Sequence, residues 1–165
     1  MARFSLYLST ALVENLVTKF FNEHVVPKME QFGEKNLAIW VAFRVPGLSF
    51  EECVLFSMKR NIMQGPFEGP CNIIAKSKCV ISWRTGLSSR EVTDLHPELL
   101  LPGETAYPGS TVNGNLVVAI SGLPDQWDEA LSIQLAAEIL GEVRFRHAAN
   151  RKAMAQNGEH FLPEA

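Results

Sequence analysis

The sequence predicts a single α+β domain, because helical and strand patterns follow one another along a chain of ordinary globular composition. Apolar residues recur at helical spacing near the amino terminus, and an unbroken apolar run follows at 37–43. The segment 104–140 then combines a hairpin with a long apolar helix. The 165 residues are 47% hydrophobic, which is enough to build one core.

The first predicted element is a helix from about Ser9 to His24, because Ser9 or Thr10 suits a helix N-cap. We expect Pro27 to end or kink this helix. Its apolar residues recur at helical spacing: Leu12, Leu16, Val17, Phe20 and Phe21.

The same segment also shows some features of a signal peptide, since Arg3 precedes the largely apolar run 4–13. Glu14 and Asn15 follow at once without a small-residue cleavage site, which favours the helix. No segment has the roughly 20 apolar residues that would cross a bilayer.

The run Leu37–Phe43 predicts a strand that is apolar on both faces, as expected where helices cover a sheet on both sides. Pro46-Gly47 ends it. Ser49 and Glu52 then form a capping-box pattern, which predicts a second helix reaching about Gly65.

The middle of the chain carries weaker signals, because Gly-Pro steps interrupt every longer pattern between positions 65 and 103. One strand is predicted at Cys79–Trp83. Arg44 and Arg84 would each lie at the end of an apolar strand.

A hairpin is predicted around the step Asn113-Gly114, because both residue types tolerate positive φ in a tight turn. Leu116–Ile120 is a short apolar run suited to a buried strand. Pro124 stops this strand and suits the first turn of a helix.

The last predicted helix runs from about Pro124 to Arg146, with Asp125 and Asp128 at its positive dipole end. It is apolar over much of its circumference, so both faces should be covered, and a subunit interface would cover one of them. Residues 1–148 form the predicted domain, and 149–165 a polar tail that is ill-ordered or reaches a neighbour.

Charge and cysteine content narrow the function classes. A net charge of −3 argues against a general nucleic-acid binder, which needs a basic surface. Cys53, Cys71 and Cys79 are odd in number and lack metal-site spacing, so we expect reduced thiols and a cytoplasmic protein. We expect no membrane partner.

Three features together carry a family resemblance: a predicted helix ending in Lys59-Arg60-Asn61, the Pro108-Gly109 step, and the string SGLPDQWDEA at 121–130. With these, the segment Thr10–Leu140 resembles the GlcG/HbpS-like family, whose members are often labelled haem-binding or haem-degrading. The resemblance implies a profilin-like fold: a central antiparallel sheet with helices on both faces. It also implies assembly into homo-oligomers and haem as a candidate cofactor.

The chain departs from the family pattern at one place. Members usually carry a Gly-Gly-x-Pro step before the penultimate strand, whereas this chain has Glu104–Gly109, ETAYPG. The acidic pair Asp128-Glu129 and the basic pair Lys59-Arg60 are retained.

In the implied fold the basic pair and the acidic pair could converge near the hairpin corner, forming a pocket for an anionic or carbonyl-bearing ligand. The alternative is that these charges only complement helix dipoles. Arg44 and Arg84 are open to the same two explanations. The candidate ligand-binding residues are Lys59, Arg60, Asn61, Tyr107 and Asp128, and the candidate catalytic residues are His96 and Glu129.

Haem would need an axial ligand, and the candidates are His24, His96, His147, His160 and Tyr107. His96 is the best placed of them, because the loop Asp94–Glu98 could bring its imidazole beside Glu104–Gly109. Cys71 and Cys79 are better explained as small buried apolar residues than as nucleophiles.

Three function classes remain open at this point. The first is a protein that binds a small molecule, such as a tetrapyrrole. The second is an isomerase, lyase or cyclase that uses His96 or Glu129 as an acid or base. The third is an oligomeric scaffold built through the last helix. No phosphate-binding loop, nucleophile elbow or zinc-protease motif is present in the sequence.

Overall fold

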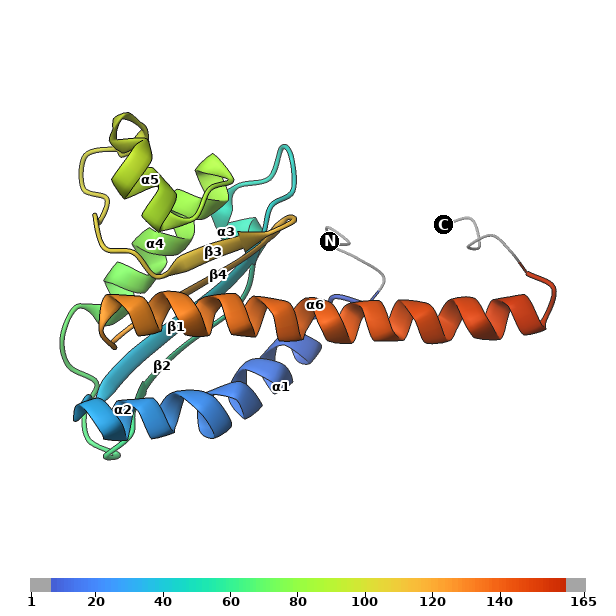
Figure 1. Cartoon of the computed structure of the whole chain (residues 1–165), viewed down its shortest axis with the longest axis horizontal. Coiled ribbons are helices and arrows are strands. Elements are labelled where there is room, and N and C mark those ends of the chain that lie inside the picture. The colour runs from blue at the N-terminus through green and yellow to red at the C-terminus, as the bar shows by residue number, and fades with distance from the viewer. Residues whose placement is uncertain (1–6, 160–165) are drawn as a thin grey trace.

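The computed structural model describes residues 7–159, and Figure 1 shows a central sheet with helices on both faces. The sheet has four antiparallel strands, which confirms the predicted α+β class. In chain order, the helices and strands are α1 (Thr10–Phe20), the π-helix η1 (Phe21–Val25), α2 (Val26–Phe32), β1 (Asn36–Phe43), α3 (Phe50–Cys53), β2 (Val54–Asn61), α4 (Cys71–Thr85), α5 (Ser89–Leu95), the 3₁₀ helix η2 (Pro97–Leu99), β3 (Ser110–Asn113), β4 (Leu116–Ser121) and α6 (Asp125–Gln156).

The strands follow the order β2-β1-β4-β3, so β1 and β4 lie in the middle of the sheet. Ile39 of β1 lies between Met58 of β2 and Ile120 of β4. All six residues of β4 are buried, because helices cover both of its faces. The strand predicted at Leu37–Phe43 is confirmed and is the core of β1.

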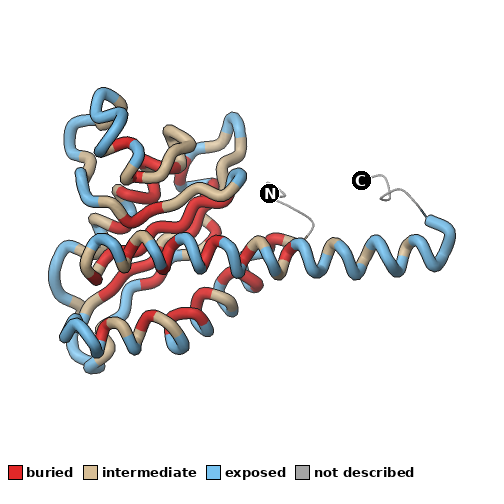
Figure 2. The backbone as a smooth tube through the Cα atoms, viewed as in Figure 1, coloured by how far each residue is buried: buried red, intermediate tan, exposed pale blue. Residues whose placement is uncertain are grey.

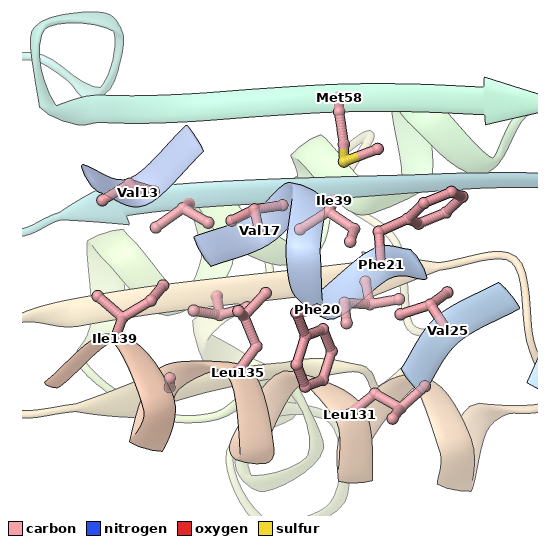
Figure 3. Close-up of a cluster of buried hydrophobic side chains, with 14 of the residues drawn as sticks. Val13, Val17, Phe20, Phe21, Val25, Ile39, Met58, Leu131, Leu135 and Ile139 are labelled. Atoms are coloured by element: carbon pink, nitrogen blue, oxygen red, sulfur yellow. The ribbon is translucent and has the colours of Figure 1, made fainter. Parts of the chain in front are cut away.

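The larger part of the core lies between the sheet and the layer formed by α1, η1 and α6. Figure 3 shows Phe20, Leu131 and Leu135 meeting the side of the sheet that carries Ile39 and Met58. A smaller cluster, in which Cys79 of α4 meets Ala119 of β4, lies on the opposite face. Helix α4 and helix α6 therefore cover different faces of the same strands.

The first helix begins as predicted and ends later than predicted. Ser9 caps it, because its Oγ accepts the N–H of Leu12 at 3.1 Å. The helical path does not end near His24 but passes through η1 into α2 and stops at Gly33, where φ is +69°. Pro27 is tolerated because the π-helical stretch brings it into the first turn of α2, where no N–H is needed.

The predicted second helix from Ser49 to Gly65 was wrong in length. Ser49 and Glu52 do form a capping box, but α3 ends at Cys53 and the chain continues as β2. β2 is an edge strand that pairs only with β1, and only Leu55 and Met58 of its eight residues are buried. The segment Lys59–Asn61 therefore lies on an edge strand and not at a helix end.

The strand predicted at Cys79–Trp83 was also wrong, because this segment belongs to α4. Its buried residues recur at helical spacing, with Ala75, Lys78 and Ser82 on one face. Gly86 ends the helix at a φ of +75°.

The predicted hairpin connects β3 to β4, and positive φ in its turn occurs at Gly114. α6 begins at Asp125, as expected, but continues past Arg146 to Gln156. Residues 149–156, expected in a polar tail that is ill-ordered or reaches a neighbour, are helical, and Figure 2 shows this part of α6 as largely exposed beyond the body of the domain.

Within residues 7–159, no helix has both the length and the apolar character needed to span a membrane. Arg3, the first residues of the apolar run that follows it, and His160 lie outside the described residues.

We predict that Gly122→Ala strongly destabilises the fold. A Cβ at this position would lie 2.5 Å from the backbone oxygen of Asn36, and φ is +142°. The free energy of unfolding should fall by at least about 2 kcal/mol, measured by urea denaturation. Gly103→Ala is the control, because its φ is +87° with nothing within 4 Å of the added Cβ, and it should cost about 1 kcal/mol. Equal losses in the two variants would contradict the close approach at Gly122.

Candidate functional site

A cleft of about 220 Å³ lies where β4 turns into α6, beside the first turns of α4. We call it the corner cleft. Its lining residues are Pro70, Cys71, Ile74, Lys78, Tyr107, Ser121, Gly122, Leu123, Asp125 and Asp128.

A buried ion pair joins two elements in the wall of the corner cleft. Lys78 Nζ lies 3.0 Å from Asp128 Oδ2, and the side chains are only 1% and 2% exposed. The same ammonium donates to the backbone oxygen of Ile120 at 2.9 Å. Because Lys78 comes from α4 and Asp128 from α6, the pair connects the helical layers on the two faces of the sheet.

Gly109 makes room for this connection at the edge of β4. Its amide oxygen accepts the N–H of Ile120, and β3 begins at the next residue. A Cβ on Gly109 would lie 2.6 Å from Lys78 Nζ and 2.8 Å from the oxygen of Ile120. The Pro108-Gly109 step, which contributed to the family resemblance, therefore leaves space for the ammonium.

The carboxylate of Asp128 is held on both of its oxygens. Oδ1 accepts the N–H of Leu123 at 3.0 Å, which fixes the corner that leads into α6. Burial raises the pKa of Asp128 to about 6, against the lowering effects of Lys78 and the backbone N–H groups of Leu123 and Gly122. The group is therefore mostly ionised at neutral pH and takes up a proton in mildly acidic solution.

Two further groups on the cleft wall, Cys71 and Tyr107, differ in their exposure. Cys71 is half-buried, and burial together with the negative charge of Asp128 raises the pKa of its thiol. A raised pKa disfavours the thiolate, which agrees with the expectation that Cys71 is not a nucleophile. Tyr107 is 56% exposed, so its ring lies at the solvent side of the cleft.

Of the predicted site residues, the structure brings together Tyr107 and Asp128 only. Lys59 and Arg60 line a different cavity, beside Trp40 and Asn72. They do not converge with the acidic pair as the sequence suggested, because β2 is an edge strand separated from β4 by β1.

Three further predicted residues have identifiable local roles. Asn61 holds the turn after β2, since its side chain donates to the oxygen of Pro66 and accepts the N–H of Met63. Glu129 forms an ion pair with Arg90 and lines a separate cavity. His96 ends α5, where its Nδ1 lies 3.3 Å from Glu98, and it does not reach the corner cleft.

The described histidines, which are candidate axial ligands for haem, are all partly exposed. His24 is 38% exposed and lies 3.8 Å from Glu138, and His147 packs against Tyr7. No histidine lines any of the four cavities described for residues 7–159.

Sequence reasoning missed Lys78, the central residue of this site. A lysine is usually a surface residue, and the sequence pattern around it predicted only a strand at Cys79–Trp83. The sequence did contain a signal for the burial of Lys78, because at helical spacing it shares a face with Ala75, Cys79 and Ser82, which are all buried.

We predict that Lys78→Met lowers the free energy of unfolding by about 3–5 kcal/mol, because it leaves the Asp128 carboxylate buried without a partner. Adding Asp128→Asn to this variant should restore part of the loss, since no unpaired charge then remains. Urea denaturation of both variants measures the difference. Lys76→Met, on the exposed side of the same helix, should cost less than about 1 kcal/mol. A double variant that is no more stable than Lys78→Met alone would contradict the ion pair.

Comparisons with known proteins support the fold. No family model matches the chain, and no curated protein is similar to it in sequence. The solved structure of the Ybr137w protein matches with a TM-score of 0.54 and 20% identity, covering 78% of this chain and 77% of that one. The DUF336 protein ORFY of Klebsiella pneumoniae matches with a TM-score of 0.50 and 16% identity, covering 86% and 97%. At these identities the likenesses show a shared α+β architecture.

Proposed function

We propose that the protein binds a small, neutral, carbonyl-bearing organic molecule in the corner cleft. The observation that carries this proposal is the buried pair Lys78–Asp128 in the cleft wall. A buried ion pair adds little net stability compared with apolar packing. Paired charges with a shifted pKa in a cleft are instead a frequent mark of a binding or catalytic site.

The charges of the cleft favour a neutral ligand. Asp128 balances the charge of Lys78, and Asp125 adds a further carboxylate to the lining. An ammonium has three N–H bonds, and Lys78 uses one for Asp128 and one for Ile120. Among residues 7–159 the third has no acceptor, so a ligand carbonyl could accept it.

The size of the cleft favours a small molecule. Its volume of about 220 Å³ is below the roughly 300–1,000 Å³ of cavities that hold drug-sized ligands. A tetrapyrrole, which the family resemblance implies, is larger than the corner cleft of one chain can enclose. The geometry therefore supports a fragment-sized ligand better than haem.

We predict that acetophenone, a neutral carbonyl probe, binds at the corner cleft and that benzoate, of similar shape but charged, binds at least about tenfold more weakly. Titration followed by backbone amide shifts in ¹H–¹⁵N spectra measures both affinities. The shifts should centre on Cys71, Leu123 and Asp128, which surround the cleft.

A pair of neighbouring variants controls this experiment. Ile74→Trp should fill the cleft and abolish binding, whereas Ile73→Trp should leave it unchanged, because Ile73 is 74% exposed and does not line the cleft. Binding that survives Ile74→Trp, or a preference for benzoate, would contradict the proposal. A stoichiometric Soret band on adding haemin would also contradict it and would favour the tetrapyrrole.

An enzyme at the same cleft is the second candidate, and one observation favours it. The pKa of Asp128, raised to about 6, lies in the range that suits proton transfer near neutral pH. An isomerase, lyase or cyclase would use Asp128 as its acid or base, in place of His96 and Glu129, which do not line the cleft. Asp128→Asn would then abolish turnover.

We also propose that the chain forms a homo-oligomer through α6. Ile133 is 51% exposed and Phe145 is 70% exposed on this helix, and Figure 1 shows its last part projecting beyond the sheet. A second copy packed along α6 would cover both side chains. The native mass of the purified protein tests this directly.

A further inference from the structure

The largest cavity described in the structure lies at the other end of β4 from the corner cleft. Its volume is about 500 Å³, and it is formed by the loop after β1, the last turn of α4 and the hairpin turn. We call it the Arg44 cavity. The lining residues that matter for its chemistry are Arg44, Val45, Pro46, Leu48, Trp83 and Arg84.

Arg44 is held in place by two other segments of the chain, the end of α4 and the hairpin turn. Its Nε donates to the backbone oxygen of Trp83 at 2.7 Å, and its amide donates to the oxygen of Asn115 at 2.7 Å. The guanidinium also packs against Gly86, where an added Cβ would lie 2.7 Å from Nη1. These contacts fix the planar group at the cavity before any ligand arrives, so little side-chain entropy remains to be lost on binding.

The positive charge of Arg44 has no partner in the part of the chain that the structure describes. No carboxylate of residues 7–159 lies within 4 Å of its guanidinium, and its two terminal nitrogens have no hydrogen-bond acceptor there. Arg84 differs, because both oxygens of Glu104 accept from it at 2.7 and 2.9 Å. The cavity therefore carries one uncompensated positive charge.

Two further N–H groups in the wall of this cavity lack an acceptor. They are Nε1 of Trp83 and Nε of Arg84, and they are the buried side-chain atoms without a partner in residues 7–159. Buried donors are nearly always paired in folded proteins, so two unpaired donors beside one cavity require an explanation. They add positive potential to the wall, which a negatively charged ligand in the cavity would offset.

We infer that the Arg44 cavity binds the carboxylate of an organic acid. A guanidinium fork matches the two oxygens of a carboxylate, and a single uncompensated charge suits a monoanion better than a phosphate dianion. Val45, Pro46 and Leu48 supply an apolar wall for the body of the acid. The volume lies within the range of cavities that enclose small organic ligands.

This inference is independent of the proposed function. The Arg44 cavity and the corner cleft share no lining residue, and they lie beside opposite ends of β4, at Leu116 and Ser121. Either site could fail its test without affecting the other.

The test uses phenylacetate as the probe and phenylacetamide, its uncharged analogue, as the control ligand. The indole N–H signals of Trp40, Trp83 and Trp127 are followed in ¹H–¹⁵N spectra, with Trp83 assigned from Trp83→Phe. Phenylacetate should shift the Trp83 signal saturably, and phenylacetamide should bind at least about tenfold more weakly, because it lacks the charge.

Arg44→Gln should weaken phenylacetate binding at least about tenfold. The phenylacetate affinity of Arg44→Lys should lie between those of Arg44→Gln and the wild type, because lysine keeps the charge but lacks the guanidinium fork. Lys59→Gln removes one positive charge from a different cavity and should change nothing. Because Arg44→Lys preserves the charge, it keeps the test valid if Arg44→Gln fails to fold.

Three results would overturn the inference. They are no saturable shift at Trp83, equal affinity for phenylacetate and phenylacetamide, or phenylacetate affinity that is unchanged in both Arg44 variants. Tighter binding of phenyl phosphate than of phenylacetate would overturn the assignment of a carboxylate.

Discussion

The ion pair between Lys78 and Asp128 is the contact on which the arrangement of this domain depends. α4 and α6 cover opposite faces of the sheet, so their side chains can meet only beyond an edge of the buried strand β4. They meet where β3 has not yet begun, and the missing side chain of Gly109 gives the ammonium access to the oxygen of Ile120. One buried contact thus links both helical layers to the corner between β4 and α6.

The two cavities lie at opposite ends of the same strand and have opposite electrostatics. In the corner cleft the charges of Lys78 and Asp128 balance, and Asp125 makes the lining slightly negative. In the Arg44 cavity one guanidinium has no counter-charge from residues 7–159, whereas its neighbour Arg84 is paired with Glu104. The shared scaffold is apolar, so ligand choice at each end is set by a few fixed polar groups.

The sequence predicted correctly those elements of the fold that interactions between neighbouring residues determine. The Ser9 cap, the strand at Leu37–Phe43 and the hairpin were correct, because capping, continuous apolar runs and turn residues act over short distances. β2 was missed because the Ser49 capping box marks where a helix begins but not where it ends. The residues after Cys53 form a strand because they pair with β1, which is a long-range contact. At the site, Asp128 was predicted, but Lys59 and Arg60 were predicted as its basic partners. Lys78 was missed because a lysine is usually a surface residue.

The charge state of Asp128 tests this account most directly. A pH titration of its side-chain carboxyl ¹³C shift in the intact protein reports its pKa without perturbing the pair. The account predicts a midpoint near 6, well above the ordinary value of 3.8, because burial outweighs the attraction of Lys78. A midpoint at or below 3.8 would contradict it, since burial would then not outweigh the attraction of Lys78 and the carboxylate would not be poised for proton exchange near neutral pH.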